Sequence, residues 1–412
     1  MNARDHAAPS AGSAGPAGAP VDTLAAWPML GTLVGFDTTS RESNLGLIEW
    51  VRDWLAHRGV AATLTYDDAR RKANLFATIP AADGNANVGG IVLSGHTDVV
   101  PVDGQPWTTD PFVATPVGDR VHGRGVCDMK GFCATALALV PEFTARRLVR
   151  PLHIALSYDE EVGCLGVRRL IDDLVARDVR PAGCIVGEPT RMRPVVAHKG
   201  KRSWRCRVQG HEAHSSLAPR GVNAVEIACR MVTRLSDLAA DYRDRGRRDA
   251  AYDVPYTTVH VGTIRGGTAL NIVPREATFD FEVRHLPHDD PESVVDALRR
   301  DAAALLPAMH AVTPDTGFEI ERLSTMPGFD TSGDTAIVAL ARSLAGDGAE
   351  VSKVSFGSEA SRFHAAAIPS VVCGPGSIDQ AHQPDEWIAV DQLARCESFV
   401  RRLADRLADP AR

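Results

Sequence analysis

The chain has 412 residues, too many for one ordinary hydrophobic core, so we expect at least two domains. It is 44% apolar and 24% charged with a formal net charge of −7, which is typical of a globular protein. It has no basic tract and no apolar run near the roughly 20 residues of a membrane span, so neither nucleic acid nor a membrane is an expected partner. Residues 1–20 are rich in Ala, Gly, Pro and Ser and lack the apolar core of a secretory signal, which predicts a disordered tail.

The cysteines indicate the compartment. None of the eight belongs to a CxxC pair, which argues against a disulfide framework and against a cysteine zinc site. We therefore expect reduced, mostly buried thiols in a cytoplasmic protein.

Strands and helices alternate through the first half of the chain. The apolar spacing predicts helices over 45–59, 129–143 and 163–177, and strands over 89–95, 152–157 and 184–189. This alternation predicts βαβ units and a largely parallel sheet in an α/β domain.

The pattern changes after residue 194. Alternating strands are predicted over 202–210, 257–267 and 276–286, with amphipathic helices over 222–243 and 291–307. The first pattern returns from about residue 316, with helices over 334–346 and 390–409 and a strand over 368–376. The predicted architecture is a discontinuous α/β catalytic domain (21–194 and 316–412) interrupted by an α+β sandwich domain (195–315).

Residues able to bind metal follow several of the predicted strands. In an open parallel sheet, ligands bind outside the carboxyl ends of the strands. The residues so placed are His96 and Asp98 after the first strand, Glu160 and Glu161 after the second, Glu188 after the third and His382 after the last, with Asp128 ahead of a buried helix.

Each of these signals has an ordinary structural explanation when taken alone. A single histidine is more often a satisfied polar residue than a ligand, and adjacent glutamates usually lie on a solvated surface. The stretch "GRGVCD" lacks the third glycine of a dinucleotide loop. The convergence favours a metal site, because two histidines and three carboxylates form a mixed nitrogen and oxygen set that suits zinc, cobalt or manganese.

The two adjacent glutamates are expected to have different roles. Successive side chains at a strand end point in different directions, so Glu161 can face a metal while Glu160 points into the cleft. There Glu160 can move a proton. Asp98 is expected to accept the ring N–H of His96.

Six motifs carry a resemblance to a known family. "SGHTDVVP", "GRGVCDMKG", "DEEVGCLG", "GEPT", "GHEAHSSLAPRGVNAVE" and "GPGSIDQAHQPDEW" resemble, in order, the M20 family of dinuclear zinc amidohydrolases and peptidases. The resemblance implies two zinc ions, replaceable by cobalt, that share Asp128. It places His96 and Glu188 on one ion, Glu161 and His382 on the other, and a cis peptide after Asp128.

The resemblance also implies an activity and an assembly. It implies hydrolysis of the acetyl amide of N2-acetyl-L-ornithine, with Glu160 as general base and acid. Succinyl-diaminopimelate, other N-acyl amino acids and dipeptides are alternative substrates, and a non-catalytic dimeric binding protein is the alternative from another class. The inserted domain is implied to form a homodimer in which His214 reaches the neighbouring active site. Asn271 and Arg284 match positions that contact substrate.

Overall fold

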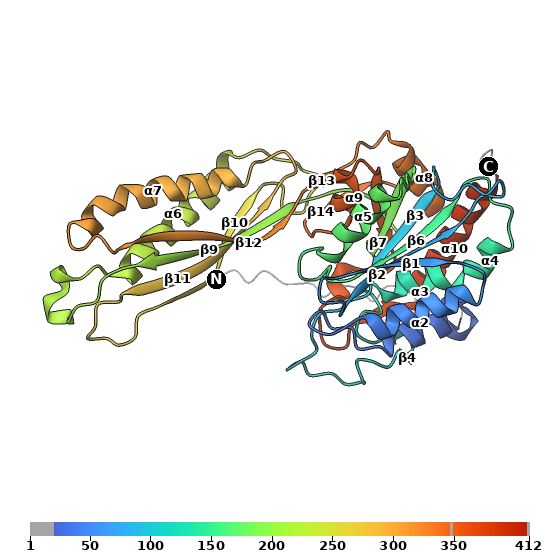
Figure 1. The fold of residues 1–412 in the computed structure, drawn as a ribbon, viewed down its shortest axis with the longest axis horizontal. Coiled ribbons are helices and arrows are strands. Elements are labelled where there is room, and N and C mark those ends of the chain that lie inside the picture. Colours follow the sequence, from blue (N-terminus) through green and yellow to red (C-terminus); the bar gives the residue numbers. More distant parts are fainter. Residues whose placement is uncertain (1–19, 347–348, 410–412) are drawn as a thin grey trace, which may run out of the picture.

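The computed structural model describes residues 20–346 and 349–409, so the predicted tail lies outside the described residues except for Pro20. The chain forms two lobes (Figure 1). We call the part built on the nine-stranded sheet the large lobe and the part built on the four-stranded sheet the small lobe.

The large lobe is built around four parallel strands. Its sheet has the order β1-β2-β6-β3-β7-β15-β8-β13, with β14 beside β8. The four central strands, β6, β3, β7 and β15, are mutually parallel, so their carboxyl ends meet at one edge. The predicted parallel sheet is therefore confirmed. The strands are β1 (Ala62–Tyr66), β2 (Ala73–Ile79), β3 (Ile91–His96), β6 (Leu152–Ser157), β7 (Gly183–Pro189), β8 (Val195–His198), β13 (Phe329–Asp330), β14 (Ser352–Val354) and β15 (Ser370–Gly374).

Helices cover both faces of this sheet. One apolar core is shared by α1 (Ala26–Val34), α2 (Leu45–Ala56), α3 (Lys130–Ala138), α4 (Val140–Thr144), α8 (Ala336–Ala345) and α10 (Val390–Ala408). A second core contains α5 (Gly166–Ala176) and α9 (Ala360–Ala365). A three-stranded sheet of β4 (Thr115–Val117), β5 (Arg120–His122) and β16 (Trp387–Ala389) and the short helices η1 (Val21–Thr23) and η3 (Ile378–Gln380) complete the lobe. Within the described ranges, no helix combines the length and the apolar character needed to span a bilayer.

The helix predicted over 129–143 is two helices in the structure. α3 ends at Ala138 and α4 begins at Val140. Pro141 lies in the first turn of α4, where its missing N–H costs nothing, whereas inside a continuous helix it would remove a hydrogen bond. The apolar pattern runs through both helices, so periodicity alone could not show the break.

The small lobe is an antiparallel sheet of order β10-β11-β9-β12. Its elements are β9 (Gly200–Gln209), β10 (Thr258–Gly266), β11 (Glu276–His285), β12 (Gly317–Met326), the helices α6 (Ala224–Arg245) and α7 (Glu292–His310), and the short helix η2 (Ser215–Arg220). One face packs on α6 and α7 around Trp204, which stacks on Phe281. The other face carries cross-strand ion pairs such as Arg205 with Asp280.

The chain changes lobes at other residues than we predicted. The inserted domain was expected to span 195–315, but β8 belongs to the large sheet and β12 pairs with β9 in the small one. The chain therefore enters the small lobe at Gly200 and leaves it after Met326. The β12 segment is half-buried, and its pattern does not reveal which of two sheets it joins. Only its pairing with the free edge of β9 decides this.

Candidate metal centre

The four central strands of the large lobe carry the predicted ligands to one edge. His96 is the last residue of β3, Glu161 follows β6, Glu188 lies near the end of β7, and His382 follows β15 and η3. Asp128 comes just before α3. The structure thus brings together the five side chains that the sequence predicts as metal ligands, in two groups.

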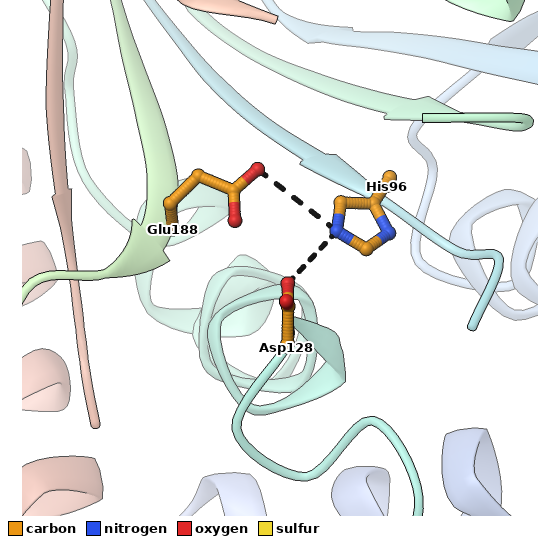
Figure 2. A group of neighbouring side chains, drawn as sticks. All are labelled: His96, Asp128 and Glu188. Atoms are coloured by element: carbon orange, nitrogen blue, oxygen red, sulfur yellow. Dashed lines mark hydrogen bonds and ion pairs between the residues drawn. The ribbon is translucent and has the colours of Figure 1, made fainter. Parts of the chain in front are cut away.

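The first group consists of His96, Asp128 and Glu188 (Figure 2). Nε2 of His96 lies 3.0 Å from Oδ1 of Asp128 and 3.9 Å from Oε1 of Glu188. One donor atom from each residue lies within 4.8 Å of the others, and all three residues are buried. Oε1 of Glu188 is itself buried and has no hydrogen-bond partner.

The second group consists of Asp128, Glu161 and His382. Nε2 of His382 lies 3.3 Å from Oδ2 of Asp128 and 3.1 Å from Oε2 of Glu161. The two oxygens of Asp128 are therefore divided, with Oδ1 toward His96 and Oδ2 toward His382. Asp128 is the only residue common to the two groups, and the peptide after it is cis, as predicted.

Asp98 supports the site in a different way from the one we expected. Its backbone carbonyl, and not its carboxylate, accepts the ring N–H of His96, at 2.9 Å from Nδ1. This bond leaves Nε2 of His96 facing Asp128. The Asp98 carboxylate instead accepts the backbone N–H groups of Glu160 at 3.1 Å and Glu161 at 3.3 Å, and the hydroxyl of Ser40 at 2.7 Å. Asp98 therefore fixes the backbone that carries both glutamates.

Glu160 belongs to neither group. Its side chain is buried, and Sγ of Cys164 donates to its Oε1 at 3.2 Å. Next to it, Asp159 has a φ of 56° and pairs with Lys72, which turns its carboxylate away from the two groups. The adjacent glutamates therefore differ in their contacts, as the sequence predicts.

Burial and repulsion between like charges disfavour the ionised forms of the acids at this site. Burial raises the pKa of Glu160 to about 8 and that of Glu161 to about 7, and it raises the pKa of Glu188 well above its ordinary value. Hydrogen bonds to Asp128 and Glu161 raise the pKa of His382 to about 10. Burial disfavours charge on Asp128 as well, but the bonds from the two imidazoles lower its pKa below the ordinary range.

These features fit divalent cations. The contacts of the two imidazoles with Asp128 offset part of the repulsion among the acids, and a cation bound to each group would supply positive charge there. The unpartnered oxygen of Glu188 faces the first group, and the donor set of imidazole nitrogens and carboxylate oxygens suits zinc, cobalt or manganese.

The other three predicted site residues lie in the small lobe. His214 is exposed and forms an isolated β-bridge with Ile272, and the carbonyl of Asn271 accepts the N–H of Ser215 at 3.0 Å. The structure therefore brings His214 and Asn271 together, but apart from the two metal-binding groups. Arg284 lies near the end of β11, and its Nε donates to Glu282 at 2.9 Å.

Sequence reasoning missed several residues that support the site. Ser40, Gln105, Arg124 and Glu386 all contact the loops that carry predicted ligands. Only Glu386 carried a usable signal, because it is an acid four residues after a candidate ligand. Arg124 lies only four residues before Asp128, but its partners Gln383 and Glu386, like the partners of Ser40 and Gln105, are distant in sequence, so only the fold reveals these contacts.

The fold and the site together define a metal-dependent hydrolase. The chain matches the model of peptidase family M20/M25/M40 over residues 92–406 and belongs to that family. The family resemblance of the six motifs is thereby confirmed.

Similar proteins agree with this assignment. The chain is 37% identical over 388 residues to an acetylornithine deacetylase of Myxococcus xanthus, covering 92% of this chain and 97% of that protein. The aminopeptidase PepT of Bacillus cereus shares the fold, with a TM-score of 0.72 and 22% identity over 93% of this chain and 98% of its own. The YXEP protein of Bacillus subtilis, described as a dinuclear metal-binding peptidase, has a TM-score of 0.64 and 14% identity over 92% of this chain and 97% of its own.

The contacts of Asp98 generate a prediction. In Asp98→Asn an amide NH2 replaces one oxygen that accepts from the backbone of Glu160 or Glu161, so this segment loses its anchor. We expect cation affinity at the group containing Glu161 to fall about 10–100-fold, measured by titration of metal-free protein. Asp83→Asn is the matched control, because Asp83 accepts the N–H of Asn85 in the loop between β2 and β3, at the other end of the strands from both groups. Equal metal affinity in the two variants would contradict the anchoring role.

Proposed function

We propose that the protein hydrolyses the acetyl amide of N2-acetyl-L-ornithine to L-ornithine and acetate, a reaction of arginine biosynthesis, and that it uses two zinc ions, which cobalt can replace. The observation that carries this proposal is the paired set of donors around Asp128 in a chain 37% identical to an acetylornithine deacetylase. His96 and Glu188 would hold one ion, Glu161 and His382 the other, and Asp128 both.

The residues divide the chemistry among them. Two cations at this site supply Lewis acidity toward the amide carbonyl and acidify nearby water. Glu160, which is buried beside the two groups and belongs to neither, takes a proton from the attacking water and delivers it to the leaving amine. Arg284 suits a substrate carboxylate, because a guanidinium binds carboxylates through paired hydrogen bonds, and Asn271 is a second proposed substrate contact.

The active unit is proposed to be a homodimer. β8 belongs to the large lobe, and β9 carries the chain away from it for ten residues, roughly 30 Å, before His214 is reached. This distance makes it hard for His214 to meet the metal site of its own chain without a large rearrangement. We propose that His214 of the partner subunit donates a hydrogen bond to the carbonyl oxygen of the substrate, where negative charge develops.

The small lobe offers a surface for this dimer. β10 and β12 are its two edge strands. Both edges expose an apolar side chain, Ile264 on β10 and Leu323 on β12. β12 bears three charged side chains, at Glu319, Glu321 and Arg322, which discourage pairing, whereas β10 bears one, at Arg265. A cavity of about 610 Å³ between α6 and β10 is lined largely by apolar residues, among them Val232 and Val261. We propose that β10 faces the second copy.

The cysteines favour a cytoplasmic location. All eight are free, and seven of them are buried. A protein of reducing compartments keeps its thiols in this state, and we propose the cytoplasm on this ground.

A direct assay tests the substrate. Purified protein loaded with zinc or cobalt should release acetate from N2-acetyl-L-ornithine faster, by kcat/KM, than it releases product from N-succinyl-diaminopimelate, other N-acetylated amino acids or dipeptides. A chelator should abolish the activity, and added zinc should restore it. A higher kcat/KM for any of the other substrates would contradict the proposal.

Substitutions of the two adjacent glutamates should have different effects on metal binding and turnover. Glu160→Gln should retain both ions and the KM for substrate but lose about 10²–10⁴-fold in kcat, because an amide cannot move the proton. Glu161→Gln should weaken cation binding at the second group instead. Metal analysis and steady-state kinetics on the two variants measure this difference. Equal loss of metal in both would refute the division of roles.

The shared site can be tested by mixing two inactive variants. His214→Ala keeps Glu160 and the metal groups, while Glu160→Gln keeps His214. Co-expressed chains pair at random, half of the dimers are mixed, and each mixed dimer has one complete site of two if His214 acts in trans. Activity should then recover to roughly a quarter of wild type.

The control is the composition of the dimers, confirmed by mass. If His214 served its own chain, every site would lack one residue. A verified heterodimer with no recovered activity would therefore exclude the shared site.

A further inference from the structure

Glu386 lies in the large lobe, four residues after His382, and it holds the loop that carries Asp128. Its side chain is 1% exposed. Oε1 accepts the backbone N–H of Cys127 at 2.9 Å and of Asp128 at 3.1 Å. Oε2 accepts the N–H of Gly125 at 3.1 Å and pairs with Nη1 of Arg124 at 2.9 Å. One carboxylate thus accepts from three backbone N–H groups of the "GRGVCD" loop and pairs with the guanidinium near its start.

Arg124 extends this network to the loop of His382. Its Nη1 also donates to the carbonyl of Gln383 at 3.3 Å, and its Nη2 donates to Oε1 of Gln105. Nε2 of Gln105 in turn donates to the carbonyl of His382 at 3.0 Å. The same buried ion pair is therefore connected to the backbones of Asp128 and His382.

The network serves two of the three predicted ligands that lie outside the strands, while the third, Glu161, is held by Asp98. His96 and Glu188 lie on β3 and β7, whose ladder bonds fix their backbones. Asp128 and His382 lie on loops, and His382 has a φ of 62°, which a residue with a Cβ adopts only when its surroundings hold it there. A second connection between these loops runs from Sγ of Cys127 to the carbonyl of Ser377 at 3.3 Å and to Oε1 of Gln380 at 3.5 Å, but a thiol is a weak donor, so the buried ion pair is the stronger link.

We infer that Glu386 is a positioning residue of the metal centre, which through Arg124 and Gln105 holds Asp128 and His382 at the spacing that the second cation requires. This inference rests on the proposed metal centre. Because two of the three residues of the second group depend on the network, while only Asp128 of the first group does, damage to Glu386 should affect the second ion more than the first.

The variant Glu386→Gln tests this inference. Its amide keeps one accepting oxygen, and its NH2 group must face either the two N–H groups at Oε1 or the N–H and guanidinium at Oε2, so donors meet donors. Metal-free protein is titrated with Zn²⁺ by calorimetry and with Co²⁺ by visible absorption. Wild type should bind two ions. The variant should keep the first, while its affinity for the second falls about 10–100-fold.

Glu397→Gln is the matched control. Glu397 is also buried, pairs with Arg401 at 2.9 Å and accepts a backbone N–H, that of Ala26, at 2.8 Å, but it lies in α10 and contacts neither loop. It should lose thermal stability to a similar degree and bind both ions as wild type does. If Glu386→Gln and Glu397→Gln lost stability alike and both bound two ions with wild-type affinity, Glu386 would be merely structural and the inference would be overturned.

If Glu386→Gln fails to fold, the variant Gln105→Met tests the inference instead. Gln105 is half-buried, and Met is of similar size but cannot donate to His382, so the fold should survive while the second ion binds more weakly. Wild-type affinity for both ions in this variant would overturn the inference. The readout is metal binding, so a wild type that binds two ions but leaves N2-acetyl-L-ornithine intact would refute the substrate alone. A wild type that binds no cation would overturn both.

Discussion

Carboxylates and imidazoles converge at one edge of the large sheet, where His382 is exposed but burial opposes charge on the acids. Glu160, Glu161 and Glu188 all have raised pKa values there, and Asp128 stays ionised because His96 and His382 bond to its two oxygens. Such a cluster is stable only with positive charge among the acids. Cations at the two groups would supply that charge, and Asp128 belongs to both groups.

Other parts of the large lobe bring these side chains together and hold them in place. Parallel strands bring side chains from distant parts of the chain to one edge, and two further carboxylates fix the connecting loops. Asp98 holds the segment of Glu160 and Glu161, and Glu386 holds the segment of Asp128. Both anchors accept backbone N–H groups and leave the proposed ligands free to face a cation. Among the described residues, the small lobe contributes no side chain to either group, so the proposed role of His214 would need either a large rearrangement of its own chain or a second copy.

Much of this architecture could be predicted from the sequence. The strand over 152–157 matches β6. The predicted ligands after the central strands, His96, Glu161, Glu188 and His382, meet as expected because the carboxyl ends of parallel strands share one edge, and Asp128, expected ahead of a buried helix, joins them. The lobe boundary was wrong, because the half-buried pattern of β12 suits either sheet. The break between α3 and α4 was missed for a similar reason.

Contacts between distant loops could not be predicted. The carbonyl of Asp98 accepts the ring N–H of His96 at 2.9 Å while its carboxylate lies 3.7 Å from the same nitrogen, and the local sequence pattern does not distinguish the two. The Arg124–Glu386 pair joins residues 262 apart, and nothing in either local pattern indicates the other. The spacing of residues in the sequence can identify candidate ligands at strand ends. The hydrogen bonds and ion pairs that hold loops in place can be seen only in the folded structure.

The central claim is that Asp128 is shared by two cations. Crystals of the zinc-loaded protein, measured on either side of the zinc absorption edge, test it most directly. The account predicts two anomalous peaks roughly 3.5–4 Å apart, each bound by one oxygen of Asp128, with His96 and Glu188 at one peak and Glu161 and His382 at the other. A single peak, or two peaks with Asp128 bound to only one of them, would contradict it.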